Sequence, residues 1–229
     1  QALGGPAPRR YFEVLRHCGA LAAIFPEIDA LFGVPQPEKW HPEIDCGIHA
    51  LMVLDQATRL SPDVDVRFAA LVHDLGKATT PAESLPSHPG HERRSVKLIK
   101  SMAERFPVPT PCRELALLVA EFHGHCHKAF ELKAVTILKL LERTDAFRRP
   151  ERFRKFLLAC EADSRGRTGF EERPYPQAAF LLGAFAAAAG IAAKDVATPD
   201  LSGARIGDAI RRKRLQAIGA FRGGADRTS

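Results

Sequence analysis

The chain has 229 residues, of which 45% are hydrophobic and 26% charged, an ordinary globular balance that can build a core. Its net charge of +6 favours a polyanionic partner, although a generally basic protein without such a partner fits the charge equally well. No apolar run approaches the length of a membrane span, which excludes an integral membrane protein of the helical class.

The cysteines predict the redox setting. They are five in number, they are scattered, and no two of them form a CxxC pair. This pattern argues against a disulfide framework and a structural zinc site, and it favours the reducing cytoplasm.

Helical periodicity accounts for most of the chain. A helical pattern at 11–31, interrupted by Pro26, leads into a proline-rich loop at 34–42 that carries Trp40. Further helices are expected at 47–60, 64–72, 91–106, 111–128, 133–147, 150–164, 176–189 and 204–221. No segment alternates with period two, and there is no internal repeat or Gly-rich phosphate loop. The sequence therefore predicts an all-α protein.

An adjacent His73-Asp74 pair lies at the end of the apolar segment 64–72. An imidazole nitrogen and a carboxylate oxygen are both good ligands for a divalent metal ion. Gly76 is expected to let the chain leave the helix, and Lys77 to reach the rim, where it could hold a phosphate. On its own, a buried pair of this kind is usually a satisfied, hydrogen-bonded couple.

Other ligand-type residues fall at helix ends. His49 lies in the first turn of its predicted helix, His91 opens another, and His123 and Asp145 lie near the ends of two more. A helical bundle can bring such ends together around one cavity. The remaining histidines fit less well: His17 and His41 fall outside the pattern, His88 could only substitute for His91, and His125 and His127 are interpreted as supporting or solvent-exposed groups.

The ordered set resembles the HD superfamily of metal-dependent phosphohydrolases. The resemblance implies an HD-domain helical bundle in which four residues hold a divalent ion: His49, His73, Asp74 and Asp145. It makes His91 and His123 optional ligands of a second ion. A metal-activated water would attack phosphorus, with Asp74 orienting the water or bridging two ions and Lys77, His91 or His123 meeting the phosphate. The catalytic candidates are His73, Asp74, Lys77 and His123.

A narrower resemblance covers nearly the whole chain. The stretches that carry it are VPQPEKWHPEIDCGIH, RFAALVHDLGK, LVAEFH and EADSRGRTGF, and they look like the C-terminal half of bacterial tRNA nucleotidyltransferases, the CCA-adding enzymes. The family's polymerase motifs, a Gly-Ser pair and paired acidic residues on strands, have no match here. We therefore expect a helical segment at 1–45 that leads from a missing nucleotidyltransferase half, an HD domain at 46–147, and a basic helical tail at 148–229. The CCA-adding active site is expected to be absent.

The resemblance also implies activities and cofactors. These are 2′,3′-cyclic phosphodiesterase, 2′-nucleotidase and phosphatase activities in tRNA 3′-end processing or repair, with nickel, manganese or magnesium as the divalent metal. One departure is Gly124, where the family leads us to expect an Asp directly after the second optional His. That departure puts the level of activity in doubt.

Arginine clusters provide candidate contacts to tRNA. They are Arg148 and Arg149, Arg165 and Arg167, and Arg211 and Arg212. Asp163 beside Arg165 is interpreted as an internal ion pair. Two alternatives stay open: a degenerate HD domain that serves as a tRNA-binding or dimerisation module, and an HD hydrolase of nucleoside triphosphates or second messengers. Homo-oligomerisation also stays open.

Overall fold

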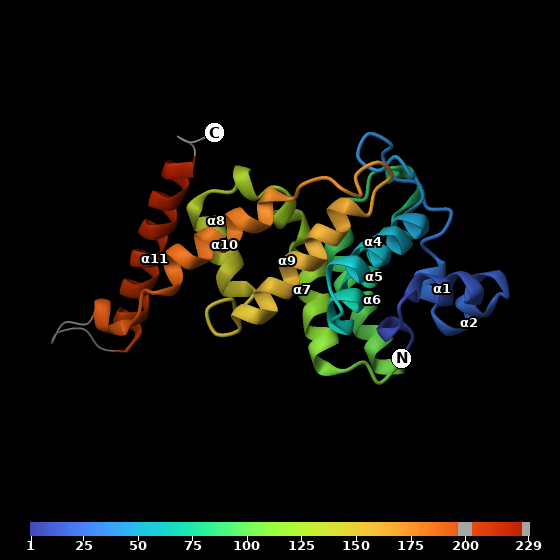
Figure 1. The fold of residues 1–229 in the computed structure, drawn as a ribbon, viewed down its shortest axis with the longest axis horizontal. Coiled ribbons are helices and arrows are strands. Elements are labelled where there is room, and N and C mark those ends of the chain that lie inside the picture. The colour runs from blue at the N-terminus through green and yellow to red at the C-terminus, as the bar shows by residue number, and fades with distance from the viewer. Residues whose placement is uncertain (197–202, 226–229) are drawn as a thin grey trace. The chain divides into compact units, whose positions relative to one another are not determined.

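A computed structural model describes residues 1–196 and 203–225, and within these ranges it contains helices and no β-strand (Figure 1). The predicted all-α fold is confirmed. The α-helices of these ranges are α1 (Pro8–His17), α2 (Ala20–Ile24), α3 (Pro26–Asp29), α4 (Cys46–Leu60), α5 (Val64–Val72), α6 (His91–Arg105), α7 (Thr110–His127), α8 (Ala134–Arg143), α9 (Pro150–Arg165), α10 (Pro176–Ala189) and α11 (Ala204–Ala225). Short 3-10 helices are η1 (Ala2–Gly4), η2 (Leu75–Thr79), η3 (Ala82–Ser84), η4 (Ala129–Glu131) and η5 (Ala193–Asp195).

The chain forms two compact units. The first comprises Gln1–Gly124 and Lys155–Tyr175, and the second comprises His125–Arg154 and the chain from Pro176 onward. These units differ from the expected boundaries of 1–45, 46–147 and 148–229. The expected boundaries came from the resemblance to a family, whereas the units are defined by contacts within this chain. The domain boundaries therefore stay a prediction.

Helices α4 and α5 build the core of the first unit. The carboxylate of Asp45 caps α4, because it accepts hydrogen bonds from the backbone N–H groups of Gly47 at 2.8 Å and Ile48 at 2.9 Å. The apolar face predicted for 64–72 is present, with Val66 and Ala70 fully buried in α5. This packing fixes the start of α4 and the end of α5, the two places where the sequence puts candidate ligands.

The loop before α4 is held in a defined shape. Pro35 and Asp45 form an isolated antiparallel bridge, and the Gln36 N–H donates to the Ile44 carbonyl at 2.8 Å. Ile44 has a φ of 60°, a left-handed conformation that is unfavourable for a β-branched residue. Such strain persists where surrounding contacts determine the backbone, so we infer that this loop is a fixed support beside α4.

Gly76 brings the His73-Asp74 turn against α6. A Cβ at position 76 would lie 2.1 Å from the backbone oxygen of His91 and 2.5 Å from the backbone nitrogen of Ser95. Only glycine allows this approach. The contact is also hydrogen-bonded, since the Gly76 N–H donates to Ser95 Oγ at 2.8 Å and the Gly76 carbonyl accepts from Arg94 Nε at 3.0 Å. The glycine that was expected to end this helix lies within η2, beyond the His73 cap of α5, and there it joins η2 to α6.

The second unit contains α8, α10 and α11. A Cβ at Gly183 in α10 would lie 2.5 Å from the ring of Phe221, so α10 and α11 approach closely at this point. The guanidinium of Arg211 donates to Glu142 of α8 at 2.9 Å, and that of Arg214 lies 3.8 Å from the centre of the Phe147 ring. The arginine run of α11 is therefore partly engaged in packing its own unit.

No described helix combines the length and the apolar character that crossing a bilayer requires. Four of the five cysteines are buried, and Cys18 is exposed. Burial raises the pKa of the Cys46 thiol to about 12, which makes it an unreactive packing residue at neutral pH.

A Gly76→Ala substitution tests the contact between η2 and α6. We expect it to lower the free energy of unfolding by about 1–3 kcal/mol, because backbone atoms of α6 have to move to admit the methyl group. Gly124→Ala is the matched control, since Gly124 lies inside α7. A Cβ at this position would lie 4.0 Å from its nearest neighbour, Glu92 Oε1, so the substitution should be neutral or stabilising by up to about 1 kcal/mol. Urea denaturation followed by circular dichroism measures both. Equal stability of Gly76→Ala and the native chain would contradict the tight approach.

Candidate metal centre

Five of the sequence-predicted ligands converge within the first unit. His49 lies in the first turn of α4, His73 and Asp74 follow the last turn of α5, His91 opens α6, and His123 lies one turn before the end of α7. A carboxylate that was not among the predicted ligands, Asp163 of α9, joins them. Overlapping groups of these side chains have ligand atoms within 4.8 Å of one another: His49, His73 and Asp74; His73, His123 and Asp163; Asp74, His91 and His123.

Each histidine is oriented in the same way. In all four, Nδ1 lies within hydrogen-bonding distance of a backbone carbonyl oxygen: His73 to Ala70 at 2.7 Å, His91 to His88 at 2.8 Å, His123 to Val119 at 2.9 Å and His49 to Gly166 at 3.0 Å. A carbonyl only accepts, so Nδ1 carries the proton and donates, which assigns the tautomer. The other nitrogen, Nε2, is left to coordinate. Metal-binding histidines are typically fixed by this kind of hydrogen bond.

The Nε2 atoms face two carboxylates. Asp74 lies 3.2 Å from Nε2 of both His73 and His91, through different oxygens, and Asp163 Oδ1 lies 3.1 Å from Nε2 of His49. Lone pairs and carboxylate oxygens repel one another unless a proton or a cation lies between them. Three buried side-chain atoms of this cluster make no hydrogen bond within the described residues: His73 Nε2, His91 Nε2 and Asp74 Oδ1. Buried polar atoms rarely remain unsatisfied, and this donor set fits a divalent cation of intermediate hardness.

Protons balance the charges when no cation is bound. Burial alone would lower the pKa of His73, but the carboxylates of Asp74 and Asp163 outweigh burial and raise this pKa to about 10. Burial alone would raise the pKa of Asp74, but His73, Lys77 and His91 hold it well below its usual value. The metal-free centre is therefore an imidazolium–carboxylate cluster, and a metal ion has to displace a proton to bind.

Lys77 lies inside this cluster, so the expected position at the rim is wrong. Its side chain is buried, with Nζ 2.7 Å from Asp74 Oδ2 and donating to Gln36 Oε1 at 2.8 Å. Burial would lower the pKa of Lys77, but Asp74 outweighs burial and raises it. Lys77 is therefore a fixed positive charge that keeps Asp74 ionised. No sequence pattern indicated this burial, because it depends on the close packing of Gly76 against α6 in the folded chain.

Asp145 is not part of the groups of ligand atoms found among the described residues, and its role as a metal ligand stays a prediction. It belongs to the second unit, where its carboxylate accepts hydrogen bonds from Arg148 at 2.7 and 3.0 Å. Asp163 is the carboxylate that the structure brings to His49 and His73. A signal for this was present: with Phe156 and Cys160, Asp163 completes an i, i+4, i+7 stripe of buried residues on α9. A carboxylate on a buried helix face needs partners, and the sequence interpretation had paired it with Arg165, which pairs with Glu161 at 2.8 Å.

Glu43 and His41 form a further layer that the sequence interpretation left out. The Glu43 carboxylate lies 2.9 Å from Nδ1 of His49 and 3.0 Å from Nδ1 of His41. It thus shares the His49 Nδ1–H with the Gly166 carbonyl. Burial would raise the pKa of Glu43, but the two histidines outweigh burial and hold it below its usual value. A carboxylate behind a ligand histidine increases the basicity of that ligand. His88, which the sequence interpretation allowed only as a substitute for His91, contacts Pro35 and Thr80.

The predicted RNA-binding arginines do not belong to one unit. Arg165 and Arg167 lie in the first, and the others lie in the second: Arg148, Arg149, Arg211 and Arg212. Three of the six pair with an acid at 2.9 Å or less: Arg148 with Asp145, Arg165 with Glu161 and Arg211 with Glu142. A contact to tRNA stays a prediction for all six.

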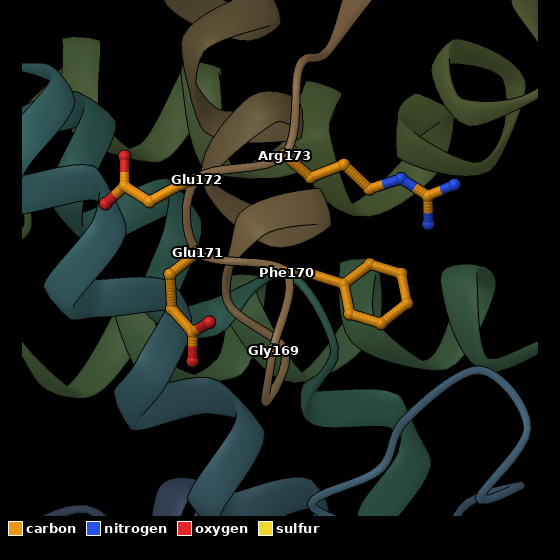
Figure 2. Close-up of a pocket in the computed structure, with 5 residues that line it drawn as sticks. All are labelled: Gly169, Phe170, Glu171, Glu172 and Arg173. Carbon is orange, nitrogen blue, oxygen red and sulfur yellow. The ribbon is translucent and has the colours of Figure 1, made fainter.

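A separate pocket follows α9. Five consecutive residues line it: Gly169, Phe170, Glu171, Glu172 and Arg173 (Figure 2). In Figure 2 the side chains of Phe170 and Arg173 point to one side of the loop and those of the two glutamates to the other. No residue of the histidine–carboxylate cluster lines this pocket, so the cluster remains the candidate site.

Comparisons with known proteins agree with the type of site. Residues 47–153 match the HD domain family, a range that includes Asp145 and ends before Asp163. The chain is 61% identical to a multifunctional CCA protein of Thioalkalivibrio sulfidiphilus over 218 residues, which is 95% of this chain and 53% of that protein. It is 54% identical to a multifunctional CCA protein of Pseudoalteromonas atlantica over 211 residues, 92% of this chain and 52% of that protein. The chain thus spans about half the length of these relatives.

Two carboxylate variants distinguish the ligand sets. We expect Asp163→Asn to weaken divalent-metal binding by at least about tenfold, because it removes a charged ligand, and Asp145→Asn to leave binding unchanged. Isothermal titration with manganese measures both, and His17→Ala, at an exposed position in α1, is the control for mutation itself. If Asp145→Asn loses manganese binding and Asp163→Asn retains it, the ligand set predicted from the sequence, with Asp145 as the fourth ligand, is the correct one.

The raised pKa of His73 predicts a pH dependence. Below its metal-free pKa of about 10 the imidazole is protonated, so metal binding releases a proton and weakens as the pH falls. The apparent affinity should drop by about tenfold per pH unit for each proton displaced. Calorimetry in two buffers of different ionisation enthalpy counts the protons. Binding without proton release would contradict the charge balance described above.

Proposed function

Given that this chain belongs, as about half of such a protein, to the family of the multifunctional CCA proteins and carries an HD domain, we propose that it is a metal-dependent phosphohydrolase. Its proposed substrates are nucleoside 2′,3′-cyclic phosphates and terminal nucleotide phosphates, and its proposed setting is tRNA 3′-end processing or repair in the cytoplasm. The proposed activities are those of a 2′,3′-cyclic phosphodiesterase, a 2′-nucleotidase and a phosphatase, with nickel, manganese or magnesium as the cofactor.

One observation carries the proposal. Buried nitrogen and oxygen atoms of His73, His91 and Asp74 face one another without hydrogen bonds. Protonated histidines pair with Asp74 in the metal-free protein, and a divalent ion would take the place of those protons. A divalent ion bound here supplies a Lewis acid and lowers the pKa of a bound water.

The residues divide into two sets on either side of Asp74. His49, His73 and Asp163 lie on the Oδ2 side together with that oxygen, and would hold the first ion. His91 and His123 lie 3.2 and 3.6 Å from Asp74 Oδ1. They are placed to hold a second ion or to donate to a phosphate or a departing oxygen. Asp74 lies between the sets, where it can orient water toward phosphorus.

We expected Lys77 to bind a phosphate at the rim of the site, and its position favours a different role. Because its ammonium group is buried against Asp74 and Gln36, it does not reach a substrate phosphate. It holds Asp74 in the ionised form, so that Asp74 can accept a proton or bind a cation at neutral pH. We therefore place Lys77 as a positioning residue and keep His73, Asp74 and His123 as the catalytic candidates.

The partner proposal rests on the relatives' name and on charge. A multifunctional CCA protein is named for the tRNA terminus, and the net charge of +6 suits a phosphate backbone. No CCA addition is proposed for this chain, since the nucleotidyltransferase motifs described above are absent from its sequence. Gly124 stands beside His123 with open space around it, so an Asp there would fit and could tune that histidine.

Hydrolysis of adenosine 2′,3′-cyclic phosphate tests the proposal. We expect the purified protein to open the ring when supplied with nickel or manganese, and Asp74→Asn to lower kcat by a hundredfold or more, about 3 kcal/mol of barrier. His17→Ala should retain the native rate, and Gly124→Asp should be measured beside it. An inactive wild type, or an active Asp74→Asn, would refute the hydrolase and favour a degenerate HD domain that serves as a tRNA-binding or dimerisation module.

A further inference from the structure

The loop before α4 exposes the only tryptophan of the chain. Trp40 is 57% exposed, although a large aromatic side chain is usually much more buried. The ammonium of Lys39 lies 4.8 Å from the centre of its ring, a cation–π contact that covers part of the ring without burying it. An exposed indole with a neighbouring cation is the combination on which nucleic acid bases stack.

Trp40 is connected directly to the metal centre. The next residue, His41, packs edge-on against the ligand His49, with ring centres 4.6 Å apart. On the other side, a single guanidinium group spans the distance from Trp40 to the cluster: Arg167 donates to the Trp40 carbonyl at 3.4 Å and lies 3.7 Å from Asp163 Oδ1. The Trp40 backbone carbonyl and the Asp163 carboxylate are therefore separated by about the width of one guanidinium group.

Arg167 is weakly held for an arginine in such a place. A guanidinium has five N–H donors, yet the two contacts of this one are long, and its buried Nε makes no hydrogen bond within the described residues. Arg148 shows the contrast, since it donates to Asp145 at 2.7 and 3.0 Å. A phosphate oxygen reaching Nη1 or Nη2 of Arg167 would gain charge-assisted hydrogen bonds shorter than these two contacts.

We propose that Lys39, Trp40 and Arg167 form a nucleoside-binding subsite of the metal centre. The base stacks on the Trp40 ring, and a phosphate oxygen of the same nucleotide meets the Arg167 guanidinium beside Asp163. This inference rests on the proposed function and refines it: the substrates are nucleotides, recognised by their base without regard to its identity, because every base presents a π-face. Phosphate esters without an aromatic base are bound through the phosphate alone.

The single tryptophan makes the subsite directly measurable. In chelator-treated protein, adenosine 2′,3′-cyclic phosphate should quench Trp40 fluorescence saturably, whereas glycerol 2-phosphate should leave it unchanged. Arg167→Met should weaken the nucleotide by about tenfold or more, while Arg59→Met, at an exposed arginine of α4, should not. Equal effects of the two ligands, or no quenching by either, would overturn the subsite.

Kinetics provide the second measurement. With metal supplied, Trp40→Leu should raise KM for the cyclic nucleotide by about tenfold and leave kcat and the hydrolysis of glycerol 2-phosphate unchanged. Tyr11→Leu, at an exposed aromatic residue of α1, is the matched control. Hydrolysis with a Trp40-independent KM would overturn the subsite while leaving the proposed function intact. Saturable quenching by the nucleotide in a protein that hydrolyses nothing would support the subsite and refute the proposed function.

Discussion

Two buried carboxylates and four imidazole nitrogens share one small space in this protein, and the rest of the first unit serves to hold them there. Asp74 and Asp163 face Nε2 atoms at 3.1–3.6 Å, in an arrangement that only protons or cations can stabilise. Backbone carbonyls fix the histidines from behind. Gly76 allows η2 to approach α6 so that His91 reaches Asp74. The same buried charges that the fold has to neutralise are therefore the groups that would bind a cation.

A closed circuit of polar contacts surrounds the centre. Its members, in order, are Asp74, Lys77, Gln36, Glu43, His49, Asp163 and His73, and each lies within 3.6 Å of the next. Because Gln36 and Glu43 belong to the loop before α4, this circuit ties that loop to helices α4, α5 and α9. The same loop carries Trp40, so the contacts that neutralise the centre also place an exposed aromatic ring beside it.

The sequence predicted the helices, the histidines and the His73-Asp74 turn, because helical periodicity and helix-end positions are local properties. It did not identify Asp163 as a candidate ligand, since Asp163 lies within α9 and only the tertiary path of that helix brings it to His49. Burial of Lys77 depends on Gly76 turning the chain inward. The role of Glu43 depends on the folded loop, and no spacing rule relates it to His49.

Anomalous diffraction from crystals grown with manganese tests the central claim most directly, because it locates the ion without any assay of activity. We expect a peak bound by Nε2 of His49 and His73 and by carboxylate oxygens of Asp74 and Asp163. A peak coordinated by Asp145, or an ordered cluster that takes up no ion at saturating manganese, would contradict it.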